Sequence, residues 1–227
     1  MPKGVVLFDV LNTLVKEAKD ESGFLAEAIR GIYGFSVDVK ESDYDGVAMQ
    51  EAIEAILLRN GAEKDYIEGG LRRIMEELPY SYYNVAGHDR IIAENGAKEV
   101  LNGLRRDGFD LGIATGAAKG MVANMFARAE VDFSMFKFGV YGDAGKTMGD
   151  IMKVAAETVP KDAGVSIDRV FVVSSAPAVV AAAKAAGLTP IGVHLGKSTE
   201  AELSGAGAKA VARDFSDRKT IRKVLEG

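Results

Sequence analysis

The second half of this chain alternates short apolar segments with amphipathic ones, and this alternation restricts the fold more than any other feature. Each apolar segment has the length of a buried strand, and the segments around it carry apolar residues at helical spacing. The predicted strands are Phe109–Ala114, Phe136–Tyr141, Val170–Val173, Pro190–Val193 and Ala208–Val211. The predicted helices are Ala97–Arg106, Lys119–Arg128, Asp150–Thr158, Pro177–Ala186, Thr199–Leu203 and Asp217–Leu225. Strands that alternate with helices form a parallel sheet covered on both faces, so we expect a Rossmann-like, three-layer α/β core.

A first strand and a long helical segment precede this alternating region. Val5–Phe8 is an apolar run that predicts a buried strand ending at Asp9. Residues 16–87 show no convincing strand pattern, and apolar residues recur there at three- and four-residue spacing, as in FLAEAIRGIYG and MQEAIEAILLRNG. We therefore expect a discontinuous core domain, residues 1–15 and 88–227, with residues 16–87 inserted as a helical cap domain.

Polar residues directly follow three of the predicted strands. Asp9 follows the first strand, Thr115 and Gly116 follow the strand in LGIATG, and Ser174 and Ser175 follow VFVV. Open α/β sheets place their sites outside the carboxyl ends of parallel strands. The sequence therefore predicts a site where these residues meet.

Composition narrows the classes of protein to which this chain can belong. The formal net charge is −5 and the basic residues are spread along the chain, which argues against a nucleic-acid partner. Cysteine is absent, which excludes disulfides, thiolate metal sites and a cysteine nucleophile. No apolar stretch is long enough for a bilayer, and the short N-terminal apolar run ends on an acid, unlike a signal peptide. We expect no membrane partner and a cytoplasmic location, and no sequence feature fixes an oligomeric state.

The polar residues resemble the motifs of the haloacid dehalogenase superfamily, and in particular its phosphoglycolate-phosphatase-like members with a helical cap. The family's first motif, Asp-x-Asp-Gly-Thr, corresponds to Asp9-Val10-Leu11-Asn12-Thr13. The resemblance implies that Asp9 is the nucleophile that forms an aspartyl-phosphate. Leu11 stands where the family's phosphatases have a second aspartate as general acid and base, and leucine cannot transfer a proton.

The second and third motifs of the family are also present. Thr115 matches the hydroxyl residue that donates to the phosphoryl group, and the backbone N–H of Gly116 follows it. In GKTMGDIM, Lys146 matches the lysine that pairs with the nucleophile and with the phosphoryl oxygens. We therefore expect Asp9 and Lys146 to form an ion pair.

The fourth motif has lost its acids. In the family two acids of this motif hold Mg²⁺, and the matching stretch here is SSAPAVVAAAKAAG. Ser174 takes the glycine position, while Ser175 and Val179 replace the two acids. Mg²⁺ prefers carboxylate oxygens in octahedral array. Although Mg²⁺ is usual for the family, we therefore expect no metal ligands and name no cofactor.

The resemblance leaves three functions open. The first is a hydrolase of a small phosphorylated metabolite, with catalysis impaired by the missing acids. Its site residues would be Asp9, Lys146 and Thr115 in catalysis and Thr13, Gly116, Ser174 and Ser175 in substrate binding. The second is a non-catalytic binding or regulatory protein that retains a pocket for a phosphorylated or carboxylate metabolite. The third is a metal-independent 2-haloacid dehalogenase, which the Ser-Ser of SSAPAVV suggests and the absence of its asparagine and later aspartate weakens.

Overall fold

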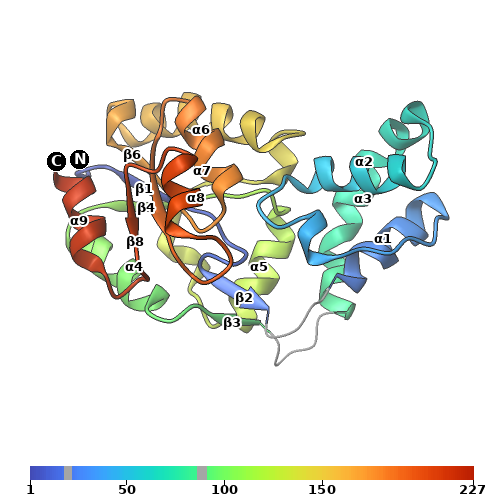
Figure 1. Cartoon of the computed structure of the whole chain (residues 1–227), viewed down its shortest axis with the longest axis horizontal. Helices are drawn as coiled ribbons and strands as arrows, with labels where there is room; N and C mark the ends of the chain where they lie inside the picture. The colour runs from blue at the N-terminus through green and yellow to red at the C-terminus, as the bar shows by residue number, and fades with distance from the viewer. Residues whose placement is uncertain (18–21, 86–90) are drawn as a thin grey trace.

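The fold is built around one parallel sheet of six strands, in the order β5-β4-β1-β6-β7-β8 (Figure 1). A computed structural model of the chain describes residues 1–17, 22–85 and 91–227. The strands of this sheet are β1 (Val5–Phe8), β4 (Asp110–Ala114), β5 (Phe136–Val140), β6 (Val170–Ser174), β7 (Thr189–Val193) and β8 (Ala210–Ala212). Neighbouring strands all pair in parallel, which confirms the predicted Rossmann-like sheet.

Helices cover both faces of the sheet because successive strand residues point to opposite sides. Val6 and Phe8 belong to the apolar cluster that includes α4, α5 and α9, whereas Val5 and Leu7 belong to the cluster that includes α6 and α7. The helices of this core are α4 (Ala97–Arg106), α5 (Lys119–Arg128), α6 (Met148–Ala163), α7 (Pro177–Ala185), α8 (Glu200–Gly205) and α9 (Arg218–Glu226). Short 3-10 turns are η2 (Phe133–Met135), η3 (Gly142–Ala144) and η4 (Ile167–Arg169). The three layers are those predicted.

A helical insertion separates β1 from the rest of the core and lies to one side of it in Figure 1. It contains α1 (Gly23–Tyr33), η1 (Glu41–Asp43), α2 (Met49–Arg59) and α3 (Lys64–Val85). Two strands flank it, β2 (Val15–Glu17) and β3 (Ile91–Ala93), and they pair antiparallel. The sequence pattern did not predict this small sheet, since its strands are too short to show a period. The predicted boundary at residues 87 and 88 lies outside the described residues, and the domain limits stay a prediction.

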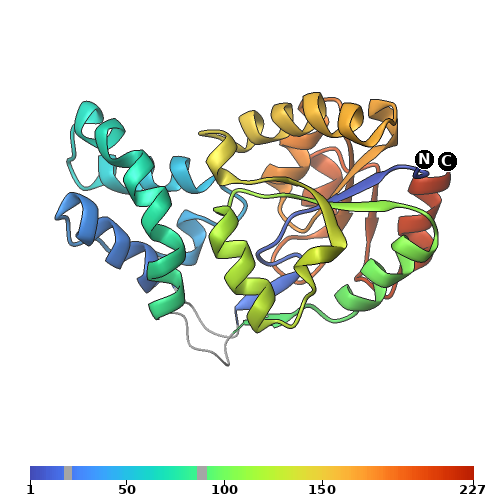
Figure 2. The ribbon, with the colours of Figure 1, turned by 180° about the vertical axis from the view of Figure 1, so that it is seen from behind.

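The insertion packs directly on the core through α3 and α5, which lie side by side in Figure 2. Asn124 of α5 donates a hydrogen bond of 3.1 Å to the carbonyl oxygen of Pro79 in α3. A β-carbon at Gly120 of α5 would lie 2.6 Å from the Pro79 ring, so the glycine allows α5 to pack closely against α3. None of the helices in the described ranges has the length and apolar character needed to cross a bilayer.

Candidate functional site

Asp9 lies at the carboxyl end of the sheet, where three adjacent strands bring their polar residues together. Its strand, β1, lies between β4 and β6, so Thr115 and Ser174 flank it. The Thr115 hydroxyl donates to Asp9 Oδ1 at 2.9 Å and the Ser174 hydroxyl to Oδ2 at 3.0 Å. The backbone N–H of Val10 also donates to Oδ1, at 2.8 Å. Three of the predicted site residues therefore meet, and the three groups that donate these hydrogen bonds to the Asp9 carboxylate are neutral.

Burial dominates the ionisation of Asp9. The side chain is nearly inaccessible to solvent, and desolvation raises the pKa of its carboxyl from 3.8 to about 6. The hydrogen bonds from Thr115, Val10 and Ser174 lower this pKa because they favour the charged form, and the charge of Asp45 raises it. Asp9 is thus a buried carboxylate without a compensating cation among the described residues.

Lys146 does not pair with Asp9, contrary to the expectation from the sequence. Its Nζ lies 3.4 Å from Glu68 of α3 and 3.9 Å from Glu54 of α2, both in the insertion. The lysine is half exposed, on the loop between η3 and α6. Gln50 of α2 donates to the carbonyl oxygens of Gly142 in η3 and Gly145 on that loop. These bonds hold the insertion, with its acids, close to Lys146. The predicted Asp9–Lys146 ion pair is therefore wrong: the acids on α2 and α3 attract the lysine instead.

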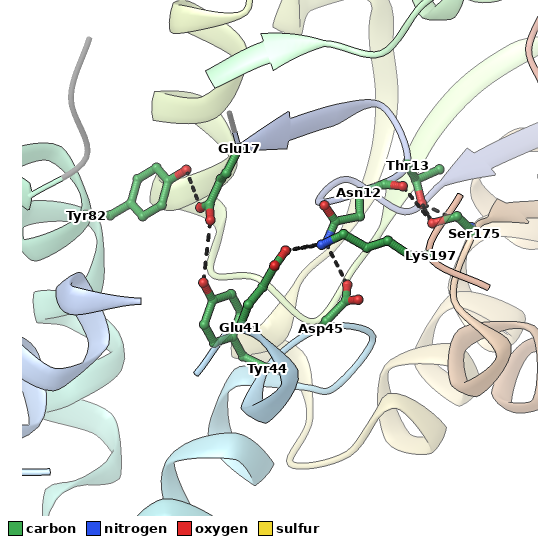
Figure 3. Close-up of polar contacts among 9 residues, drawn as sticks. All are labelled: Asn12, Thr13, Glu17, Glu41, Tyr44, Asp45, Tyr82, Ser175 and Lys197. Carbon is green, nitrogen blue, oxygen red and sulfur yellow. Dashed lines mark hydrogen bonds and ion pairs between the residues drawn. The ribbon is translucent and has the colours of Figure 1, made fainter. Parts of the chain in front are cut away.

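Thr13 and Ser175 form a second, separate contact between the loops after β1 and β6 (Figure 3). The Ser175 backbone N–H donates to the Thr13 hydroxyl oxygen at 3.1 Å, and the Ser175 hydroxyl donates to the carbonyl oxygen of Asn12 at 2.6 Å. Both side chains are buried and neither lines the cavity beside Asp9. Their contacts connect the loop after β1 to the loop after β6, and their predicted role in substrate binding stays a prediction.

Asn12 links the core to residues 41–45 of the insertion, through Glu41 and Asp45. Its backbone has a φ of 56°, a left-handed conformation that asparagine tolerates. The side-chain amide donates to Asp45 at 2.8 Å and to Glu41 at 3.1 Å, and Lys197 forms an ion pair with Glu41 (Figure 3). Nothing in the sequence indicated the contacts that Asn12 and Lys197 make with the insertion.

A small cavity adjoins Asp9 at the contact between core and insertion. Its volume is about 20 Å³, room for roughly one water molecule. Gly116 lies at its edge, and a β-carbon there would lie 2.3 Å from the carbonyl oxygen of Val47 in the insertion. The walls are mostly apolar, formed by Leu11, Phe24, Val47, Val179 and four methionines, Met49, Met121, Met125 and Met148. The insertion is thus closed over the nucleophile position.

Glu17 is a second carboxylate of this cavity, and the sequence motifs did not indicate it. It lies at the end of β2 and lines the cavity together with Asp9. The hydroxyl of Tyr82 donates to one of its oxygens at 3.2 Å and that of Tyr44 to the other at 3.5 Å (Figure 3). The ring of Phe24 packs edge-on against both tyrosines. Two tyrosines therefore fix the orientation of a carboxylate in the cavity wall.

The residues present do not fit a magnesium ion. Where the family has acids, Leu11 and Val179 offer no oxygen and Ser175 donates its hydroxyl proton to a backbone carbonyl. Both oxygens of Asp9 already accept hydrogen bonds. Within the described ranges, no group of three or more His, Cys, Asp or Glu side chains is arranged to hold a metal. A divalent ion needs several oxygen ligands, and of the positions where the family has acids only Asp9 keeps a carboxylate here.

One family model matches this chain. A family model described as haloacid dehalogenase-like hydrolase matches residues 4–187. No curated protein matches the chain in sequence.

Solved structures share the fold over nearly the whole chain. A hydrolase from Pseudomonas syringae is 21% identical with a TM-score of 0.73, covering 97% of this chain and 98% of its own. A predicted phosphatase from Clostridium acetobutylicum is 18% identical with a TM-score of 0.65, covering 99% of both chains. A predicted phosphoglycolate phosphatase from Haemophilus somnus is 15% identical with a TM-score of 0.68, covering 98% of this chain and 99% of its own. At these identities the likeness concerns the fold.

Proposed function

Because the chain belongs to the haloacid dehalogenase-like hydrolase family, we propose that it is a family member whose magnesium-dependent phosphatase chemistry is lost or strongly impaired. Its crevice beside Asp9 binds a small, mainly apolar ligand instead of a phosphate ester. One observation carries this proposal: neutral hydroxyls of Thr115 and Ser174 donate to Asp9, while Lys146 pairs with Glu54 and Glu68.

Phosphoryl transfer needs positive charge around the transferring group, because its oxygens carry the developing charge. Here the family's lysine position, Lys146, faces two glutamates of the insertion. The general acid position holds Leu11, so a leaving alkoxide has no proton donor there; a positioned acid contributes about 10²–10⁴-fold in rate. The pairing of Lys146 with the insertion and the loss of the general acid each oppose phosphatase turnover.

The shape and lining of the cavity support ligand binding. Ligand sites are mostly apolar with a few placed polar groups, and this cavity combines methionine and phenylalanine walls with Asp9, Thr115 and Glu17. In the closed arrangement it holds about one water molecule. A ligand therefore enters when the insertion separates from the core at the contact between Val47 and Gly116.

Metal-independent dehalogenation is a second candidate, favoured by the apolar walls around the Asp9 carboxylate. In that reaction Asp9 displaces a halide from carbon to form an ester, and water then releases the hydroxy product. A 2-haloacid carries a carboxylate, however, and no Lys, Arg or His occurs among the described residues that line the cavity. Halide release from 2-chloropropionate that is lost in Asp9→Asn would establish this candidate.

A phosphatase assay tests the main proposal. Hydrolysis of an aryl phosphate is measured with and without Mg²⁺ for the wild type and Asp9→Asn. We expect the same background rate in all four measurements. Turnover that rises with Mg²⁺ and disappears in Asp9→Asn would contradict the proposal.

A further inference from the structure

We propose that two clusters of oppositely charged side chains hold the insertion closed on the core, so that ionic strength controls access to the cavity beside Asp9. Together these clusters form an electrostatic latch. The latch consists of Lys146 with Glu54 and Glu68, and of Lys197 with Glu41. The inference rests on the proposed function for its consequence, since separation of the insertion from the core is the step that admits a ligand.

The two clusters have the same polarity. Lys146 and Lys197 belong to the core, on the loop between η3 and α6 and on the loop between β7 and α8. Their acidic partners all belong to the insertion. Acidic residues also outnumber Lys and Arg across residues 22–85. Opening therefore separates a negatively charged insertion from lysines of the core, which opposes opening.

The clusters lie on opposite sides of the strand that leads to Asp9. In the sheet, β5 and β7 lie on opposite sides of β1. Lys146 follows β5 and contacts α2 and α3, whereas Lys197 follows β7 and contacts η1 at Glu41 (Figure 3). The latch therefore holds the insertion at two separate points, one on each side of the cavity.

Salt should weaken this latch more than the other contacts between core and insertion. Lys146 and Lys197 are each nearly half exposed, so mobile ions can reach both. Exposed charges are screened over about 10 Å at 0.1 M salt and about 3 Å at 1 M. The hydrogen bonds from Gln50 to Gly142 and Gly145 join neutral groups and are not screened in this way. High salt should therefore favour opening by acting on the latch.

One backbone amide reports directly on opening. The N–H of Met49 donates to the carbonyl oxygen of Gly116 in the core at 3.0 Å. Met49 begins α2, and the first N–H groups of a helix have no partner inside it, so this amide loses its acceptor when the insertion opens. The N–H of Ala52 donates to the carbonyl oxygen of Ala48 within the insertion, and should stay protected. The ratio of their exchange rates isolates opening from unfolding.

Amide hydrogen exchange followed by NMR tests the latch in the full chain. The wild type, Lys146→Met, Lys197→Met and the double variant are compared at about 0.05 M and about 1 M NaCl. At low salt we expect exchange at Met49, relative to Ala52, to accelerate about two- to fivefold in each single variant and further in the double variant. At high salt all four proteins should exchange alike. Lys137→Met is the matched control, since its ion pair with Asp110 lies within the core.

A second comparison assigns the effect to the named partners. Adding Lys146→Met to a protein that already carries Glu54→Gln and Glu68→Gln should cause no further acceleration, because the lysine has lost the acids with which it pairs. Further acceleration of the same size as in the wild type would refute the pairing.

The outcomes separate this inference from the proposed function. Exchange at Met49 that responds neither to salt nor to the lysine substitutions would overturn the latch and leave the apolar ligand standing. Equal acceleration in Lys137→Met would overturn the assignment to the two clusters. Phosphatase turnover that requires Mg²⁺ and Asp9 would instead contradict the proposed function, whatever the response of Met49 to salt.

Discussion

Lys146 Nζ lies 3.4 Å from the Glu68 carboxylate, so the lysine at the family's cationic position forms ion pairs with the insertion. Glu54 approaches the same nitrogen at 3.9 Å. These ion pairs join the loop before α6 to α2 and α3, across the contact between core and insertion. The residue that would neutralise Asp9 in a phosphatase therefore takes part in closing the insertion.

Replacing Lys146 should leave the ionisation of Asp9 unchanged. We expect the pKa of Asp9 in Lys146→Met to equal that of the wild type, because the lysine's ion pairs are with Glu54 and Glu68. Thr115→Val, by contrast, should raise this pKa, because it removes a hydrogen bond that favours the charged carboxylate. Carbon-13 NMR titration of the Asp9 carboxyl measures both. A pKa that rises in Lys146→Met would show that the lysine reaches the site in solution.

The stability of the fold should depend on pH through Asp9. Its pKa is about 6 when folded and 3.8 when exposed, so between these values the folded state binds the proton more tightly. The free energy of unfolding from this group therefore falls as pH rises from about 4 to about 6, by roughly 3 kcal/mol. Asp9→Asn, which does not ionise, should gain stability relative to the wild type over this interval. Urea unfolding at several pH values measures the difference, with Glu51→Gln as control; a difference that is constant with pH would refute the assignment.

Magnesium should not stabilise this protein. A ligand that binds only the folded state raises the unfolding temperature by mass action. Because Ser175 and Val179 replace the two acids that hold Mg²⁺ in the family, we expect the same unfolding temperature in millimolar Mg²⁺ and in EDTA. Calcium at the same concentration controls for ionic strength. A shift specific to Mg²⁺ and absent in Asp9→Asn would show that the remaining carboxylate suffices for binding.

Gly116→Ala should push the insertion away from the core. An added β-carbon would lie 2.3 Å from the carbonyl oxygen of Val47. The atoms that it would meet belong to the backbone of Val47 and Ala48, so no flexible side chain can move aside. We expect a loss of about 1–3 kcal/mol in unfolding free energy, as for overpacking elsewhere. Gly31→Ala in α1 is the matched control, since nothing lies within 4 Å of its added β-carbon and alanine favours a helix. Equal effects of the two substitutions would contradict a tight contact at Gly116.

Two core helices could be predicted from the sequence with accurate limits, whereas the predicted helix Asp150–Thr158 is longer in the structure, where α6 spans Met148–Ala163. The helices Ala97–Arg106 and Lys119–Arg128 begin and end where their apolar spacing predicts. The strands that lead to Asp9, Thr115 and Ser174 bring these residues together as predicted, because parallel strands in one sheet end at the same edge. The two short strands β2 and β3 could not be predicted, since three residues carry no measurable period.

The motifs of the sequence indicated the family. The sequence also determined the parallel sheet and the meeting of Asp9 with Thr115 and Ser174, because these depend on local apolar patterns and strand order. Only the tertiary structure decided which charges surround Asp9. The position of Lys146 depends on Glu54 and Glu68, which lie far from it in sequence, and Glu17 enters the cavity through the packing of Tyr44 and Tyr82. Charge interactions depend on distance in space, and the closure of the insertion on the core sets those distances.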